Sequence, residues 1–141
     1  MLPRFKHLLI PLDFTEKNRA ALEIGFEIAV HNHSRVTLLH VVEEITDADE
    51  ELKQFVNRLS ERGAAELERT AQRFAEAKLA VETKVRVGHR LQEIVRDSVE
   101  RGADLIVMSS HKVDPASPLK SWNTLSYQVS IACPCPILLV K

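Results

Sequence analysis

Residues 7–29, HLLIPLDFTEKNRAALEIGFEIA, contain a strand pattern followed by a helix pattern, because the spacing of the hydrophobic residues changes once along this segment. Residues 7–12 form a short apolar run closed by Pro11 and Asp13, which is typical of a buried strand. Thr15 is expected to cap a helix, in which small and branched residues recur every three or four positions: Ala21, Ile24, Gly25, Ile28 and Ala29. The stretch therefore predicts a buried strand and a helix that packs on a sheet and ends near His31.

The rest of the chain repeats this alternation. Apolar runs predict strands at residues 35–42, 105–108 and 136–140, and a period-two pattern at 81–87 predicts a less buried strand towards a sheet edge. Helical spacing predicts a long amphipathic helix over 47–77, a helix defined by Leu91, Ile94, Val95 and Val99 and stopped by Gly102, and a last helix capped by Asn123 or Thr124. Strands separated by helices need crossover connections and hence a parallel sheet. We predict one α/β domain over residues 1–141, a doubly wound five-stranded parallel sheet sandwiched by about four helices.

Composition narrows the range of partners. The 141 residues carry 19 Lys and Arg against 20 Asp and Glu, and 45% are hydrophobic, so neither a nucleic-acid partner nor disorder is expected. No apolar run is long enough for a membrane span, and the first residues lack the pattern of a secretory leader. The only cysteines are Cys133 and Cys135, too few for a disulfide framework or a metal site. We expect a cytoplasmic protein with two buried thiols leading into the last strand and no metal held by these cysteines.

Candidate site residues follow from the topology, because open α/β sheets bind ligands beyond the carboxyl ends of their strands. This rule selects Pro11, Leu12 and Asp13 after the first strand, Val41 and Val42 at the second, Gly88 at the third, and residues 109–111 after the fourth. Asp13 is the most informative, since a carboxylate at a sheet end needs solvent, a hydrogen-bond donor or a cation. It has two open interpretations: it holds Mg²⁺ or a ligand amine, or it helps Thr15 to cap the first helix.

A phosphate group would sit in the segment 109–124. The amino end of the last helix offers N–H donors, the hydroxyls of Thr124 and Ser126 can donate, and Lys112 or Lys120 can neutralise charge. The segment contains no glycine, which argues against close approach of the backbone to a phosphate. His111 stands at the same rim, whereas His40 lies within a strand and is expected to be a satisfied buried histidine. No nucleophile elbow, Walker A sequence or zinc-protease motif is present, which argues against those classes of enzyme.

Four stretches together carry a family resemblance. They are residues 7–29, quoted above, VTLLHVVEE at 36–44, VRVGHRLQEIVRDSVERGADLIVMSSH at 85–111 and ACPCPILLVK at 132–141. Over essentially its whole length the chain resembles the universal stress protein family. The resemblance implies an adenine nucleotide alpha hydrolase-like fold and a homodimer paired through residues 136–141. An apolar edge strand there would independently favour pairing with a second copy.

The resemblance also implies a ligand, ATP or AMP with Mg²⁺. Nucleotide-binding members carry Gly-x2-Gly-x9-Gly-(Ser/Thr) after the fourth strand, and Ser109, Lys112 and Asn123 occupy the three glycine positions here. Thr124 falls on the final hydroxyl position, and the second interval is one residue longer. By resemblance Asp13 and the backbone near Val41 would contact the adenine and ribose. The full set of implied contacts is Pro11, Leu12, Asp13, Val41, Met108, Ser109, His111, Lys112, Asn123, Thr124 and Leu125.

Three functions fit these observations. The first is a dimeric stress-response module that binds an adenine nucleotide. The second is a scaffold or chaperone-like dimer without nucleotide, which the replaced glycines favour and which the retained Asp13 and Thr124 oppose. The third is a slow nucleotide hydrolase in which Asp13 positions Mg²⁺ and His111 or Lys112 stabilises phosphate charge. We expect a binding module rather than an enzyme.

Overall fold

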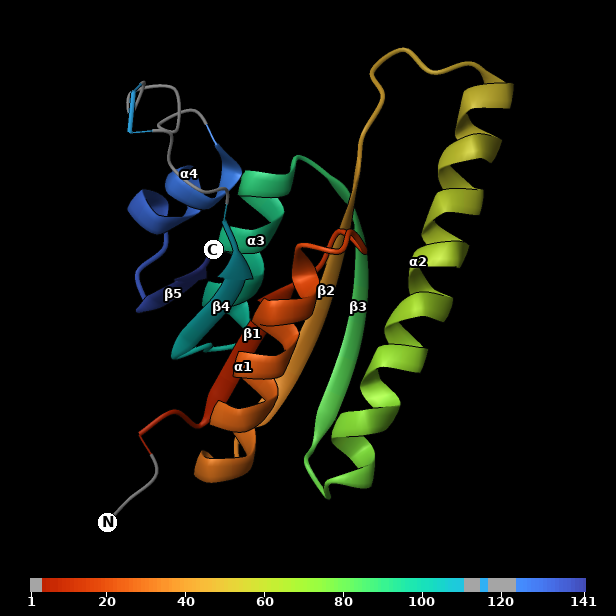
Figure 1. Cartoon of the computed structure of the whole chain (residues 1–141). Helices are drawn as coiled ribbons and strands as arrows, with labels where there is room; N and C mark the ends of the chain where they lie inside the picture. Colours follow the sequence, from red (N-terminus) through yellow and green to blue (C-terminus); the bar gives the residue numbers. More distant parts are fainter. Residues whose placement is uncertain (1–3, 111–114, 117–123) are drawn as a thin grey trace.

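Strands and helices alternate along the whole chain in a computed structural model, which describes residues 4–110, 115–116 and 124–141 (Figure 1). The elements are β1 (His7–Pro11), α1 (Asn18–Asn32), β2 (Arg35–Glu43), α2 (Glu50–Glu76), β3 (Val81–Gly88), α3 (Arg90–Glu100), β4 (Leu105–Ser109), α4 (Leu125–Ala132) and β5 (Ile137–Val140). Each predicted strand and helix is present, with ends that shift by a few residues. No helix among the described residues has the length and apolar character needed to cross a bilayer.

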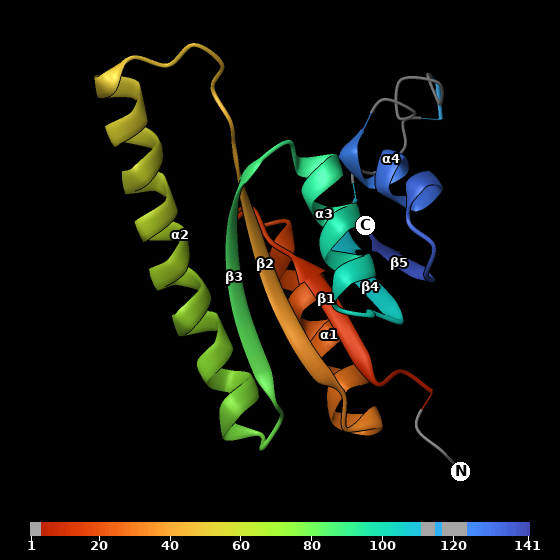
Figure 2. The same ribbon diagram turned by 180° about the vertical axis from the view of Figure 1, so that it is seen from behind.

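The five strands form one parallel sheet in the order β3-β2-β1-β4-β5, which confirms the predicted doubly wound α/β fold. Helices α1 and α2 cover one face, and α3 and α4 cover the other (Figures 1 and 2). Side chains alternate between the faces, so β1 buries Leu8 and Ile10 against α1 and Leu9 against α3 and α4. Strand β3 lies at one edge of the sheet, as its weaker burial pattern predicted, and β5 lies at the other.

Two of the predicted helix-end residues are confirmed, and one is not. Thr124 caps α4 through a bond from Tyr127 N (3.4 Å), and Gly102 follows α3 with φ +66°. Helix α2, for which no cap was predicted, is capped by Asp49, whose Oδ1 accepts from Leu52 N (2.9 Å). Thr15 does not cap α1, so that expectation was wrong. The helix begins at Asn18, because the hydroxyl and backbone N–H of Thr15 instead donate to the Asp13 carboxylate.

The buried face of α3 also differs from the predicted one. Val99, expected to pack on the sheet, is 60% exposed, whereas Ile94 is buried together with Glu93, Asp97 and Ser98. Burying charge is unfavourable unless it is paired, and Asp97 is paired twice. Its Oδ1 accepts from Arg86 Nη2 on β3 (3.0 Å) and from Arg101 Nε (3.1 Å). These ion pairs turn a polar stripe of α3 towards the sheet.

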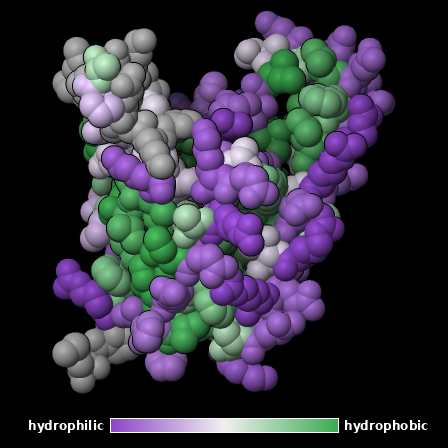
Figure 3. Space-filling view, in the orientation of Figure 1, coloured by the Kyte–Doolittle hydropathy of each residue, from purple (hydrophilic) through white to green (hydrophobic). Residues whose placement is uncertain are grey.

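Helix α2 follows the sheet closely along only part of its length. Gly63 makes the close approach possible, because a Cβ at this position would stand 2.7 Å from Cδ2 of the His40 ring on β2. His40 is half-buried rather than buried, but it is satisfied, with Nδ1 2.7 Å from Leu12 O. Nearer its start the helix leaves Leu52 and Phe55 39% and 44% exposed, and Figure 3 shows the resulting hydrophobic area on that half of α2.

The Cys-Pro-Cys turn lies between α4 and β5. Both Cys133 and Cys135 are free and half-buried, and burial raises the pKa of both thiols. The thiol form is therefore favoured over the reactive thiolate, in line with the predicted structural role.

A buried histidine begins the central strand. His7 is 6% exposed, with Nδ1 2.9 Å from Arg101 O and Nε2 2.7 Å from Thr37 Oγ1. Burial is the largest effect and lowers the pKa of His7 below its ordinary 6.5, against the hydrogen bond with the Arg101 carbonyl, which raises it. The positive charge of Arg35 lowers the pKa further, and the smaller effects of Asp104 and of the Arg101 charge oppose each other. The folded protein therefore holds His7 neutral at a pH where the unfolded chain begins to bind a proton.

Stability should fall as the pH drops below about 6.5, because the unfolded chain then binds more protons at His7 than the folded protein does. One such group changes the free energy of unfolding by at most about 1.4 kcal/mol per pH unit. We expect denaturant titrations between pH 7 and pH 5 to show this loss for the natural chain and a smaller loss for His7→Gln. The exposed His31→Gln should behave like the natural chain; equal pH dependence in all three proteins would contradict the assignment.

Candidate functional site

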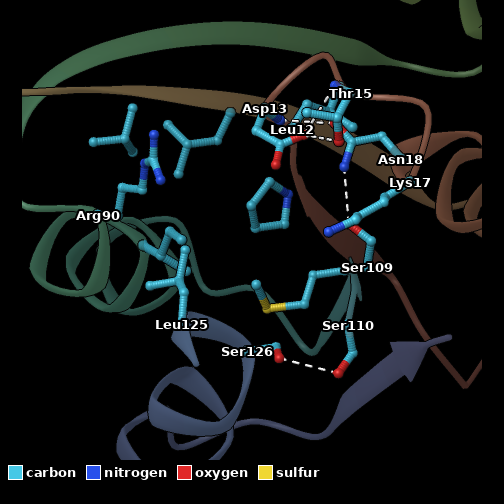
Figure 4. Close-up of a pocket in the computed structure, with 15 residues that line it drawn as sticks. Leu12, Asp13, Thr15, Lys17, Asn18, Arg90, Ser109, Ser110, Leu125 and Ser126 are labelled. Carbon is cyan, nitrogen blue, oxygen red and sulfur yellow. Dashed lines mark hydrogen bonds between the residues drawn. The ribbon is translucent and has the colours of Figure 1, made fainter. Parts of the chain in front are cut away.

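A cavity of about 180 Å³ opens at the carboxyl edge of the sheet, between the ends of β1 and β4. Strand order reverses here, because β2 lies on one side of β1 and β4 on the other. This is the place where doubly wound folds bind ligands. Apolar side chains form the floor, and polar side chains from the β1–α1 loop, α3 and the end of β4 surround it (Figure 4).

The β1–α1 loop is held in place by one buried amide side chain. Asn18, 4% exposed, accepts hydrogen bonds at Oδ1 from Asp13 N (2.7 Å) and Phe14 N (2.9 Å). Its Nδ2 donates to Ser109 Oγ on β4 (2.8 Å). Phe14 has φ +64°, a strained value for a bulky residue, so the turn needs this support. Asn18 therefore fixes Asp13 relative to β4.

Asp13 presents an ionised carboxylate to the cavity. Its Oδ1 accepts from Thr15 N (3.0 Å) and Thr15 Oγ1 (2.7 Å). Partial burial by itself would raise the pKa of Asp13, but the two bonds from Thr15 and the positive charge of Arg90 outweigh it and hold the pKa below its ordinary value. At neutral pH the side chain is thus an acceptor for ligand hydroxyl or amine groups.

Hydroxyl groups gather on the opposite wall, at the end of β4 and the start of α4. Ser110 Oγ lies 3.1 Å from Ser126 Oγ, and Thr124 Oγ1 lies 3.4 Å from the same Ser126 oxygen. Ser109 Oγ receives the bond from Asn18 described above. The wall can therefore donate and accept hydrogen bonds with little side-chain rearrangement.

The structure brings most of the predicted site residues together. The cavity is lined by Pro11, Leu12, Asp13, Val41, Met108, Ser109 and Leu125. Thr124 does not line it directly but caps α4 beside Ser126. His111, Lys112 and Asn123 lie outside the described residues. The interpretation that Asp13 helps Thr15 to cap the first helix is wrong, because Thr15 does not cap α1. Asp13 faces the cavity, and its contact with Mg²⁺ or a ligand amine stays a prediction.

Sequence reasoning missed Lys17, Asn18 and Arg90, which also line the cavity. Arg90 is the first residue of α3, two positions beyond the strand end that the topology rule selected, so extending that rule into the next helix would have found it. Lys17 and Asn18 stand at the start of α1, where the expected cap at Thr15 drew attention to the wrong residue.

Comparison of the sequence with a family model and with known proteins bears on the family resemblance described above. The model of the universal stress protein family matches residues 4–141. Universal stress protein YxiE of Bacillus subtilis is 24% identical over 148 residues, covering 97% of this chain and 99% of the relative.

Two solved structures share the fold. Universal stress protein UspA from Lactobacillus plantarum superposes with a TM-score of 0.76 at 19% identity, covering 98% of this chain and 99% of the other. The universal stress protein from Archaeoglobus fulgidus in complex with dAMP superposes with a TM-score of 0.66 at 13% identity, covering 96% and 98%. The family match over nearly the whole chain confirms the resemblance seen in the sequence: this chain belongs to the universal stress protein family.

Proposed function

We propose that this protein is a stress-response module that binds an adenine nucleotide in the cavity between β1 and β4. The observation that carries the proposal is the pairing of an apolar floor with an ionised Asp13 at the point where strand order reverses. Val41 and Met108 are suited to the face of a purine, and Asp13 is suited to accept from ribose hydroxyls. The dAMP complex of a protein with the same fold supports this ligand class.

Calorimetric titration of the nucleotide-stripped protein with AMP and ATP, with and without Mg²⁺, tests the proposal. We expect saturable binding that Asp13→Ala weakens at least tenfold, because a hydrogen bond to a charged group contributes about 1.5–3 kcal/mol. Glu16→Gln removes an exposed carboxylate from the same loop outside the cavity and should leave affinity unchanged. Equal loss in both variants would show that Asp13 has no specific role.

The second candidate function is a scaffold that binds no nucleotide. The absence of glycine from residues 109–124 and the exposed Leu52 and Phe55 on α2 are the observations that support this second function. If no adenine nucleotide gives binding heat at high protein concentration, the scaffold function replaces nucleotide binding as the proposed function.

We further propose that the working form is a homodimer paired through β5. This strand ends the sheet, and Leu138 on it is 38% exposed. Figure 3 shows a hydrophobic area on this side of the molecule. An apolar edge of this kind is an aggregation risk unless another strand pairs with it. Antiparallel pairing with a second copy would cover it.

Sedimentation measures the dimer directly. The natural chain should sediment at about twice 15.9 kDa, and Leu138→Lys should sediment as the monomer, because burying an unpaired charge at the interface is unfavourable. Val87→Lys is the matched control, since Val87 is 47% exposed on the opposite edge strand β3. A monomer from Val87→Lys but a dimer from Leu138→Lys would place the interface on the other edge.

A further inference from the structure

Two cationic side chains stand on opposite sides of the cavity. Lys17 comes from the start of α1 and lies on the Ser109 side, while Arg90 comes from the start of α3 (Figure 4). Asp13 lies between them and is the only carboxylate among the described residues that line the cavity. Two positive charges and one negative charge leave the lining with one net positive charge, so it is suited to an anion.

The position of Arg90 is set by a residue outside this cavity. Glu43 at the end of β2 accepts a hydrogen bond at Oε1 from Arg90 N (3.2 Å), and the same oxygen lies 3.7 Å from Arg90 Nε. The Arg90 side chain is 49% exposed, which leaves it room to turn. Arg90 therefore lies between two acidic groups, Glu43 outside the cavity and Asp13 inside it. An anion in the cavity would compete with Glu43 for the guanidinium.

Among the described residues, the end of β4 and the start of α4 offer a phosphate hydroxyl groups but no positive charge. The sequence of residues 109–124 contains no glycine, the residue that close backbone approach to a phosphate usually requires. An Arg guanidinium, in contrast, presents a planar fork of donors that fits phosphate oxygens two at a time, and a Lys ammonium adds a point charge. The hydroxyls of Ser109 and Ser110 lie on the same wall as Lys17 and can complete the contacts (Figure 4).

We propose that Arg90 and Lys17 bind the single phosphate of an adenine nucleoside monophosphate from two sides, and that Glu43 weakens this binding by holding Arg90. The proposal rests on the proposed function, because it assigns the phosphate contacts of the same cavity. The charges of the two cations equal in number those of a phosphate dianion. Asp13, which Thr15 already holds in place, accepts hydrogen bonds from the ribose hydroxyls. The first phosphate after the ribose is the one recognised, so further phosphates add little affinity.

Titrations with adenosine, AMP and ATP separate the contribution of the phosphate from that of the nucleoside. We expect AMP to bind the natural chain at least tenfold more tightly than adenosine, and ATP to bind no more tightly than AMP. Arg90→Gln and Lys17→Gln should each weaken AMP binding about tenfold and leave the affinity for adenosine unchanged. Glu43→Gln keeps an oxygen for Arg90 N but removes the competing charge, and should raise AMP affinity about twofold to threefold.

Arg19→Gln is the matched control, because Arg19 lies on α1 two residues beyond Lys17 and does not line the cavity. It should bind AMP as the natural chain does. Equal affinities for adenosine and AMP, or AMP binding that survives both Arg90→Gln and Lys17→Gln, would overturn the phosphate assignment and leave the nucleotide site standing. ATP binding more than tenfold tighter than AMP would overturn the monophosphate class. Failure of adenosine, AMP and ATP alike would overturn the proposed function together with this inference.

Discussion

Replacing Asp97 with alanine is expected to lower the free energy of unfolding by about 3 kcal/mol. Asp97 is completely buried on α3, and its Oδ1 accepts from both Arg86 and Arg101. Removing one partner of a buried ion pair leaves the other charge without compensation, which is the costly case. Arg86 and Arg101 keep exposed acidic neighbours in Glu100 and Glu82, so the loss stays at the lower end of the usual range. Denaturant unfolding monitored by circular dichroism measures it.

Glu100→Gln is the control for this prediction. Glu100 contacts the same Arg86 (3.2 Å), but its side chain is 56% exposed, so its loss should change the free energy of unfolding by less than about 1 kcal/mol. Equal effects of Asp97→Ala and Glu100→Gln would contradict the idea that burial makes the Asp97 pair important. Asp97→Asn adds a second check, because it keeps the shape and removes only the charge. Oδ2 of Asp97 has no partner among the described residues, so the amide group gains little there.

The ion pairs of Asp97 with Arg86 and Arg101 also affect the cavity, because they hold α3 in place. This helix carries two residues of the cavity lining, Arg90 and Ile94. Arg86 joins α3 to the edge strand β3, and Arg101 joins the end of α3 to Glu82 on the same strand. Loosening these contacts should therefore move one wall of the cavity as well as destabilise the fold. Asp97→Ala is expected to weaken nucleotide binding although Asp97 lies outside the cavity.

The alternation of strands and helices was predictable from the sequence because it follows from the hydrophobic period. Short apolar runs such as residues 7–12 cannot form stable helices, and the helical spacing between them fixes the alternation that a parallel sheet requires. The face of α3 was not predictable in this way. Counting apolar positions selected Val99, whereas ion pairs with Arg86 on β3 and with Arg101, four residues beyond Asp97, allow Asp97 to be buried. The Arg86 pair joins two elements, and nothing in the apolar pattern of the helix indicates it.

The candidate site was predictable where it consists of strand ends and was missed where it depends on loop geometry. Pro11, Asp13 and Ser109 follow from the rule that ligands bind at carboxyl ends. Asn18 and Lys17 do not, because their place depends on where α1 begins, and helix starts are the least certain feature of a sequence pattern. Residue propensities do not predict the turn at Phe14 either, because a bulky residue rarely adopts a positive φ.

Replacing Asn18 with alanine is expected to weaken AMP binding at least tenfold and to lower the free energy of unfolding by about 2 kcal/mol. The variant loses the acceptor for Asp13 N and Phe14 N and the donor to Ser109 Oγ, so three partly buried polar groups lose this partner. The strained Phe14 should then relax and displace Asp13 from the cavity. Calorimetry measures the affinity, and hydrogen exchange at the Asp13 and Phe14 amides, expected to quicken, reports the turn without any ligand.

Asn32→Ala distinguishes a local effect on the site from a general loss of stability. Asn32 ends the same helix, and its Oδ1 likewise accepts from two backbone groups, Arg4 N (3.1 Å) and Phe5 N (3.3 Å), at the far end of the sheet. Its removal should lower stability by about 1 kcal/mol and leave AMP affinity and the exchange of the Asp13 amide unchanged. If Asn18→Ala keeps natural affinity and slow exchange at Asp13, Asn18 merely supports the fold. If both variants lose affinity in proportion to stability, the cavity responds to overall loosening, and the β1–α1 turn does not set the position of Asp13.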